Sequence, residues 1–381
     1  MTSVRRQFPT AEAEALLDLT REIANSELRT VADEHEEAGR FPRDAFRLLG
    51  KSGLLSLPYP EEHGGGGQPF EVYLQMLEEL AAAWLTIGVG VSVHVLSCHP
   101  VAMFGTQEQR DRWLGEMLGG DLLGAYCLSE RQSGSDAAAL ETRAAREDAG
   151  YRVNGAKAWI THGGVADYYN LMVRTGGPGP GGISCLLADS GTLGLSAAAP
   201  ERKMGMNGSP TAEILLDDAL LPADRLIGDE GEGFRIAMAA LDSGRLGIAA
   251  CAVGLAQAAL DSAVDYAKQR RQFGKSIAAF QGLAFLMADM AAKVASGRAL
   301  YLDAARRKDA GLPFGSQAAI AKLVATDAAM SVTTDAVQIL GGAGYCRDFP
   351  VERYMREAKV LQIVEGTNQV QRIVIARELL A

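Results

Sequence analysis

The chain has 381 residues, 48% of them hydrophobic and 22% charged, which excludes a largely disordered chain and allows a sizeable core. Its 37 basic and 47 acidic residues leave a net charge of −10, which argues against nucleic-acid binding, because a phosphate backbone needs a basic face. The five cysteines form no C-x-x-C pair and predict no disulfide framework. No histidine or cysteine spacing matches a metal site, and we expect no metal.

The longest apolar stretches, at 81–93 and 246–256, are shorter than a helix that spans a bilayer. Acidic residues soon follow Arg5 and Arg6, which argues against a secretory signal. We therefore expect a cytoplasmic protein without membrane association.

Residues up to about 120 are predicted to be helical. Thr10 can cap a first helix, and a second helix is expected from about Pro42 to Gly50. The four glycines at 64–67 lack the G-K-[S/T] of a phosphate-binding loop, which favours a surface turn.

From about residue 121 to residue 229, short apolar segments are separated by turns rich in glycine and proline, which predicts an antiparallel β domain. The segments lie at 122–128, 141–146, 151–160, 167–174, 183–188 and 212–216. Gly177, Gly179 and Gly182 fit G-x-G-x-x-G, but the prolines between them and the apolar strand after them indicate a hairpin turn, not a dinucleotide site.

A helical period returns at about residue 230. Helices are predicted at 236–268, 285–310, 318–340, 351–364 and 369–380. The sequence therefore predicts a mainly α fold with a β domain. An N-terminal helical domain is expected at 1–121, a middle antiparallel β domain at 122–229 and a C-terminal helical bundle at 230–381.

A loop rich in small hydroxyls follows the first predicted strand, with the sequence YCLSERQSGSD at 126–136. Its Ser129 and Ser135 could bond a polar, planar ligand. The residues alone favour an ordinary turn closed by Asp136.

A second motif, KAWITHGG, occupies 157–164. On an extended chain Trp159 and Thr161 point to the same side, and an indole beside a hydroxyl suits an aromatic heterocycle. The alternative is a core tryptophan on a half-buried strand.

A third motif, VLQIVEGTNQ, occupies 360–369, where Glu365 ends an apolar helical run. Partial burial there would raise the pKa of the carboxyl group toward the range of a general base. Thr367 could cap the next helix, whose N-terminus could face a phosphate. A solvent-exposed glutamate at a helix end is the alternative.

These three motifs, with RRQFG at 270–274 and QILGG at 338–342, resemble the acyl-CoA dehydrogenase flavoproteins over almost the whole chain. The resemblance implies an N-terminal helical domain, a middle β domain and a C-terminal four-helix bundle. It also implies FAD as cofactor, an acyl-CoA substrate, electron-transfer flavoprotein as acceptor and a homotetramer built as a pair of dimers.

The resemblance assigns roles to individual residues. The isoalloxazine and ribityl part of FAD would be held by Tyr126, Leu128, Ser129, Ser135, Trp159 and Thr161. The pyrophosphate and adenosine would meet Thr367, Asn368 and Gln369. A neighbouring subunit would contribute Arg270, Gln272, Phe273, Phe280, Gln281, Gln338, Gly341 and Gly342. The acyl-CoA site would be lined by Ser135, Asp242, Arg245 and Gly366.

By the same resemblance, Glu365 would remove the α-proton of the acyl thioester while the β-hydride passes to flavin N5, which gives a trans-2-enoyl product. Its backbone N–H and the ribityl 2′-hydroxyl would bond the thioester carbonyl. Some members carry the base one residue before the arginine that matches Arg245, but Gly244 stands there in this chain.

Two departures from the family pattern are Arg131, where proline is common, and Val364, where tyrosine is frequent. Neither decides the acyl chain length or the carrier, CoA or a carrier protein. A flavin oxidase or monooxygenase on the same scaffold, and a non-catalytic acyl-CoA-binding homologue, are the alternative functions.

Overall fold

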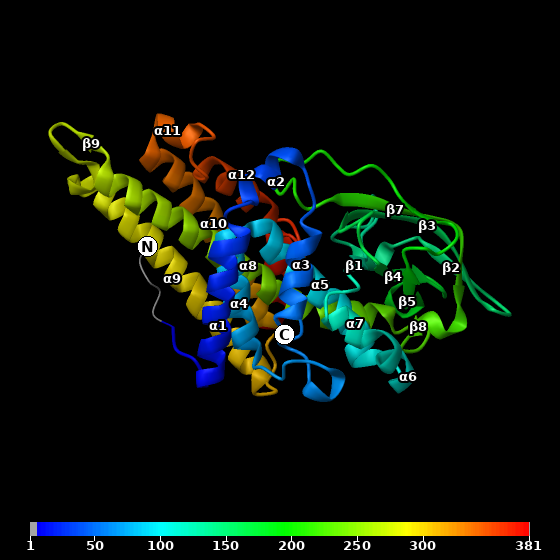
Figure 1. Cartoon of the computed structure of the whole chain (residues 1–381). Helices are drawn as coiled ribbons and strands as arrows, with labels where there is room; N and C mark the ends of the chain where they lie inside the picture. Colours follow the sequence, from blue (N-terminus) through cyan, green and yellow to red (C-terminus); the bar gives the residue numbers. More distant parts are fainter. Residues whose placement is uncertain (1–5, 381) are drawn as a thin grey trace.

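The N-terminal helices form where the sequence supplies caps and apolar faces. A computed structural model describes residues 6–380 (Figure 1). Thr10 caps the first helix by accepting a hydrogen bond from the N–H of Ala13 at 3.1 Å, as predicted. The helices are α1 (Ala11–Ile23), α2 (Ala32–Ala38), α3 (Arg43–Lys51), α4 (Phe70–Ala83), α5 (Leu85–Phe104), α6 (Gln107–Gln109) and α7 (Gly115–Leu118).

The glycines at 64–67 form the predicted turn. The N–H groups of Gly66 and Gly67 donate to the carbonyl oxygens of Ser56 and Tyr59, both at 2.9 Å. Because the chain itself takes up these donors, they are not free to bind a phosphate.

The middle of the chain forms an eight-stranded sheet with the order β6-β7-β3-β2-β4-β5-β8, in which β1 also pairs with β4. The strands are β1 (Gly124–Cys127), β2 (Arg143–Glu147), β3 (Gly150–Thr161), β4 (Tyr168–Arg174), β5 (Ile183–Asp189), β6 (Leu195–Ala197), β7 (Thr211–Pro222) and β8 (Leu226–Ile227). The prediction of a purely antiparallel domain is wrong, because β4 runs parallel to β1 and β2. Their connections are long enough to return the chain in the same direction.

The G-x-G-x-x-G match lies in the hairpin between β4 and β5, as predicted. Arg174 pairs with Ile183 across the two antiparallel strands. The Arg174 guanidinium donates to the carbonyl oxygens of Gly177 and Gly179 at 2.6 and 3.1 Å, so the turn is held from within.

The C-terminal helices surround α10, which packs against α8, α9, α12 and α13. The helices are α8 (Gly233–Gln269), α9 (Gln281–Asp309), α10 (Gly315–Leu340), α11 (Gly342–Tyr345), α12 (Val351–Leu361) and α13 (Asn368–Leu379). The hairpin β9 (Arg271–Gln272) and β10 (Lys275–Ser276) joins α8 to α9 and projects at the far end of the bundle from the sheet (Figure 1). The helix predicted at 351–364 ends at Leu361, which leaves a short turn before α13.

Two helices are buried in the main core, which joins the N-terminal and C-terminal helices. By length and composition α5 and α8 are apolar enough to cross a membrane, but 83% and 78% of their apolar windows are buried. The predicted apolar stretches are shorter than these helices, so burial, not length, marks them as core elements.

Candidate functional site

A buried ion pair fixes the serine-rich loop to strand β3. Lys157 on β3 and Glu130 in the loop pair at 2.7 Å, with side chains 0% and 2% exposed. Glu130 also accepts hydrogen bonds from the N–H groups of Glu141 and Thr142 at 2.6 and 3.0 Å. Burial would raise the pKa of Glu130, but Lys157 and these donors hold it below its usual range.

Trp159 leaves the regular strand. Its φ is 57°, inside an irregularity of the β3–β7 pairing between Lys157 and Ile160, and its side chain is 52% exposed. The alternative of a core tryptophan is therefore wrong, and so is the simple extended geometry from which its direction was argued. The indole stands free beside a strand that buries Ile160 and half-buries Thr161.

Two hydroxyls close to this strand have no hydrogen-bond partner among the described residues. The N–H of Ala158 donates to the carbonyl of Ser129 at 2.9 Å, which brings the loop beside Trp159. The hydroxyls of Ser129 and Thr161 are partly buried and make no hydrogen bond within residues 6–380. An exposed indole with two unused hydroxyls suits a flat, polar ring system.

Glu365 lies in the turn between α12 and α13, in a left-handed conformation with φ 55°, and Gly366 follows with φ 84°. Its Oε2 atom is shielded from solvent and has no hydrogen-bond partner in the part of the chain that the structure describes. A Cβ atom built on Gly244 of α8 would lie 2.7 Å from this oxygen. The carboxylate therefore faces α8 at the residue where a side chain is missing.

Burial raises the pKa of Glu365 from 4.5 to about 7, against the opposing effect of Arg245 and Lys322. Arg245 pairs with Asp242 at 2.5 Å one turn away on α8. The Tyr126 hydroxyl is buried without a partner among the described residues, and the negative charge of Glu365 contributes to its raised pKa. Strand β1, α8 and the α12–α13 turn thus meet at one shielded carboxylate with a pKa near neutrality.

The first residues of α13 serve the protein itself. Thr367 accepts a hydrogen bond from the N–H of Val370 at 3.3 Å and caps the helix, as predicted. Asn368 is buried and its side-chain amide bonds Lys322, Thr326 and Asp327 of α10. The Asn368 side chain is therefore bonded within the protein, whereas the Gln369 side chain is exposed, and the contact of these residues with FAD stays a prediction.

Comparisons with known proteins identify the family of the chain. Three family models match the chain: the acyl-CoA dehydrogenase N-terminal domain at residues 10–121, the middle domain at 125–219 and the C-terminal domain at 231–380. The chain belongs to the acyl-CoA dehydrogenase family.

Similar proteins cover nearly the whole chain. An acyl-CoA dehydrogenase of Bacillus subtilis (strain 168) is 43% identical over 373 residues, which are 97% of this chain and 98% of the relative. The structure of butyryl-CoA dehydrogenase from Megasphaera elsdenii has a TM-score of 0.96 and 39% identity and covers 99% of this chain and 100% of that chain. A chain solved in a study of the electron transferring flavoprotein of Acidaminococcus fermentans has a TM-score of 0.96, 42% identity and the same coverage.

One group of predicted site residues of this family member lies away from Glu365. The hairpin and the α10–α11 corner sit at the end of the bundle opposite the sheet (Figure 1). Phe273 at the hairpin tip is 92% exposed and contacts Phe280 edge-on at 6.0 Å. The group comprises Arg270, Gln272, Phe273, Phe280, Gln281, Gln338, Gly341 and Gly342. Within one chain these residues do not complete the site around Glu365.

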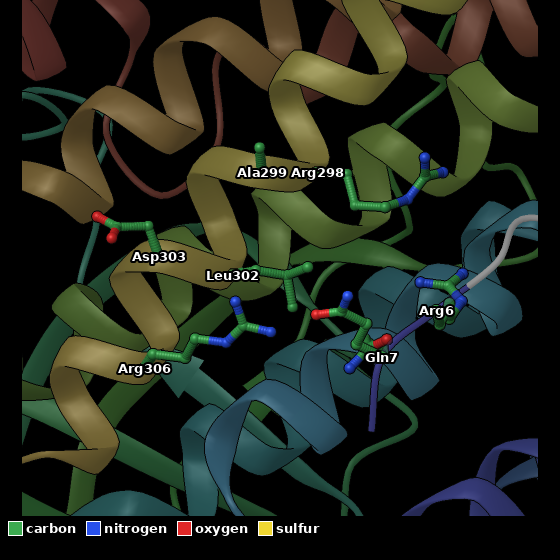
Figure 2. A pocket seen from close by; sticks show the side chains of 8 residues that line it. Arg6, Gln7, Arg298, Ala299, Leu302, Asp303 and Arg306 are labelled. Atoms are coloured by element: carbon green, nitrogen blue, oxygen red, sulfur yellow. The ribbon is translucent and has the colours of Figure 1, made fainter. Parts of the chain in front are cut away.

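A cavity of about 350 Å³ lies elsewhere, between α4, α9 and the N-terminal segment (Figure 2). Figure 2 shows Arg298 and Arg306 on α9 and Arg6 on the N-terminal segment around it. Glu78 pairs with both Arg6 and Arg298 at 2.8 Å. None of the lining residues is a predicted site residue, so this cavity is separate from the predicted site around Glu365.

Sequence reasoning missed the residues that support the site. A lysine at residue 157, inside a predicted strand, could have indicated an acidic partner such as Glu130, because buried charges need partners. Lys322 and Thr326, four residues apart in an alanine-rich helix, gave another, because they share one helix face. The departure at Arg131 is explained by its ion pair with Glu213, which neutralises its charge.

Proposed function

We propose that this protein is an FAD-dependent acyl-CoA dehydrogenase that converts a short-chain acyl-CoA to its trans-2-enoyl product, with Glu365 as the base. The observation that carries the proposal is the shielded Glu365 carboxylate, which faces Gly244 with no hydrogen-bond partner among the described residues. Its pKa of about 7 suits a base that must be ionised before reaction and accept a proton during it.

The residues present fit FAD. The exposed indole of Trp159 and the free hydroxyls of Ser129 and Thr161 would hold the isoalloxazine, together with Tyr126 on β1 and Leu128 and Ser135 in the loop that follows it. Thr367 and Gln369 at the start of α13 would approach the pyrophosphate through the helix N-terminus. When bound, FAD supplies the acceptor for the hydride that leaves the β-carbon.

The chain's own residues account for the proton and the carbonyl. Glu365 takes the α-proton at its carboxylate and becomes a neutral acid, a change that an apolar environment favours. The backbone N–H of Glu365 donates to no acceptor within residues 6–380, so it is free to bond the thioester carbonyl. Such a donor stabilises the negative charge that develops on this oxygen. Asp242, Arg245, Ser135 and Gly366 would line the path of the acyl-CoA.

The substrate class and partners are supported by relatives. The likeness to the butyryl-CoA dehydrogenase of Megasphaera elsdenii supports a short acyl chain. The likeness to a chain from the Acidaminococcus fermentans study supports an electron-transferring flavoprotein as acceptor. The exposed Phe273 supports a homotetramer in which neighbouring subunits complete each FAD site. Five free thiols support a reducing, cytoplasmic location.

The Glu365→Gln variant tests the proposal. The purified variant is expected to keep FAD in a one-to-one ratio and to lose flavin bleaching by butyryl-CoA without oxygen, by about 10²-fold or more. Full bleaching by the variant would overturn the assignment of the base. Rapid oxygen consumption by the wild type would indicate an oxidase or monooxygenase, and a colourless protein that binds acyl-CoA would indicate a non-catalytic homologue.

A further inference from the structure

The position of the Glu365 carboxylate depends on its backbone, because no described side chain bonds its Oε2 atom. Both Glu365 and Gly366 adopt left-handed conformations. Glycine tolerates this conformation, whereas glutamate rarely adopts it unless the surroundings hold it. Some group must therefore fix the turn.

Two side chains from different helices donate hydrogen bonds to the carbonyl oxygens of this turn. Lys322 of α10 donates from Nζ to the Gly366 carbonyl at 2.9 Å. Gln371 of α13 donates from Nε2 to the same oxygen at 2.8 Å and to the Glu365 carbonyl at 3.2 Å. The Gly366 oxygen, which has two lone pairs, accepts from both.

The Lys322 side chain is itself held in place. The residue is 0% exposed, and its Nζ also donates to Oδ1 of Asn368 at 2.9 Å. Asn368 in turn donates to Thr326 at 2.9 Å and to Asp327 at 2.7 Å. A lysine built into such a network has few rotamers left, so it is a rigid hook and not a mobile surface charge.

The charged and titratable groups around Glu365 come from four elements. Arg245 of α8 and Lys322 of α10 lower its pKa. Burial raises the pKa of Tyr73 of α4 and of Tyr126 of β1, and the negative charge of Glu365 adds to both shifts. Arg245 already pairs with Asp242. Lys322 faces Glu365, Asp327 and Arg245, and burial lowers its own pKa to about 8.

We propose that Lys322 is a positioning residue for the base: it fixes the Gly366 carbonyl so that the Glu365 carboxylate faces Gly244, and it supplies a buried positive charge opposite that carboxylate. This inference rests on the proposed function, since it assigns Lys322 to the base of that reaction. Gln371 shares the first task but carries no charge.

The two tasks predict different defects. Loss of the Lys322 charge raises the pKa of Glu365, because the ionised carboxylate loses a favourable neighbour. The midpoint of the titration then moves to higher pH by about one unit. Loss of the Gln371 hook leaves the charge in place, so the midpoint stays while the turn loosens and the rate at high pH falls.

The test compares Lys322→Gln, which keeps a donor but removes the charge, with Gln371→Met, which removes a donor without a charge. Lys322→Arg keeps the charge, and Lys268→Met removes an exposed positive charge from α8 as a matched control. The first readout is the carboxylic-acid stretch of Glu365 in infrared difference spectra of the FAD-loaded protein against pH, identified by its absence in Glu365→Gln. The second is the anaerobic rate of flavin bleaching by butyryl-CoA over the same pH range.

We expect the infrared midpoint to rise in Lys322→Gln, to return toward the wild-type value in Lys322→Arg and to stay unchanged in Gln371→Met and Lys268→Met. An unchanged midpoint in Lys322→Gln overturns the proposal, as does an equal shift in Lys268→Met. The infrared titration needs no turnover. If the infrared midpoint shifts in Lys322→Gln but none of the acyl-CoAs tested bleaches the flavin of the wild type, the proposed function fails, whereas the effect of Lys322 on Glu365 stands.

Discussion

Gly244 and Glu365 lie opposite each other so closely that a Cβ atom on Gly244 would stand 2.7 Å from the Glu365 Oε2 atom. The space that Glu365 uses is therefore the space that a side chain at residue 244 would fill. This contact explains in physical terms why the base can belong to one of these two positions but not to both.

The Gly244→Ala substitution is expected to displace the carboxylate and to lower the rate of flavin bleaching by about 10²-fold, because a misplacement of about 1 Å can cost that much. Alanine is a better helix former than glycine, so α8 itself is not weakened. Stopped-flow measurement of anaerobic bleaching checks this expectation. Gly115→Ala, where a Cβ atom meets nothing within 4 Å, is the control, and an equal loss of rate there would contradict the explanation.

The rate of flavin bleaching should depend on pH through Glu365. Because its pKa is raised from 4.5 to about 7, the base is ionised above pH 7 and protonated below it. The rate is expected to rise about tenfold per unit up to that pH and then to level off. The free energy of unfolding should change with pH in the opposite direction from the rate. Between pH 4.5 and 7 Glu365 is protonated in the folded state and ionised in the unfolded state, so its contribution to stability falls as pH rises through that window.

A rate profile that stays flat over about two pH units on either side of the expected midpoint would contradict the assignment. Denaturation midpoints of Glu365→Gln and wild type over the same range provide the second check. The variant cannot ionise at residue 365, so its stability should fall less as pH rises.

The Lys157–Glu130 pair is expected to be needed for stability and for the loop. Lys157→Met leaves the Glu130 charge buried and unpaired, and should lower the free energy of unfolding by about 3–5 kcal/mol. The double variant Lys157→Met with Glu130→Gln should recover part of that loss, because no charge remains buried. Urea unfolding of the two single variants and the double variant measures the coupling. Simple additivity of the two single effects would contradict the buried-pair interpretation.

Trp159 is expected to matter for the cofactor and little for the fold. Because its side chain is 52% exposed, Trp159→Ala should change the free energy of unfolding of the FAD-free protein by less than about 1 kcal/mol. It should weaken FAD binding by about fivefold or more, the loss of one aromatic contact. Fluorescence titration of the FAD-free protein measures the affinity. Trp113→Ala, which removes a buried indole under Arg225, is the matched control and should cost about 3–5 kcal/mol of stability.

The sequence was sufficient to predict helices first, then a sheet, then a second group of helices, because apolar spacing and caps are local signals, but it did not predict short elements such as α2, β6 and β8. Thr10 and Thr367 cap their helices as predicted. The parallel pairing of β4 with β1 and β2 was not accessible, because strand partners depend on how distant segments meet and not on the residues of one strand. The domain boundaries predicted at 121/122 and 229/230 stay predictions.

The motifs led to the right segments but not to their surroundings. Glu365 was identified from its place before a glycine, yet its contact with Gly244 and the hook from Lys322 join residues that lie far apart in the chain. Trp159 was placed on the correct strand, but its left-handed backbone was hidden from a period-two argument. Asn368 has a side chain that could bind a ligand, but it forms hydrogen bonds to α10. The sequence shows which side chains could act as a base or bind a ligand, whereas tertiary packing determines which residues they contact.

The hairpin tip carries a further consequence. Phe273, at the end of the molecule opposite the sheet, is 92% exposed in the single chain, so most of its apolar surface is left in water there. If Phe273 completes the flavin site of a neighbouring subunit, dilution separates the subunits and releases FAD at the same time. The apparent affinity for FAD therefore rises with protein concentration.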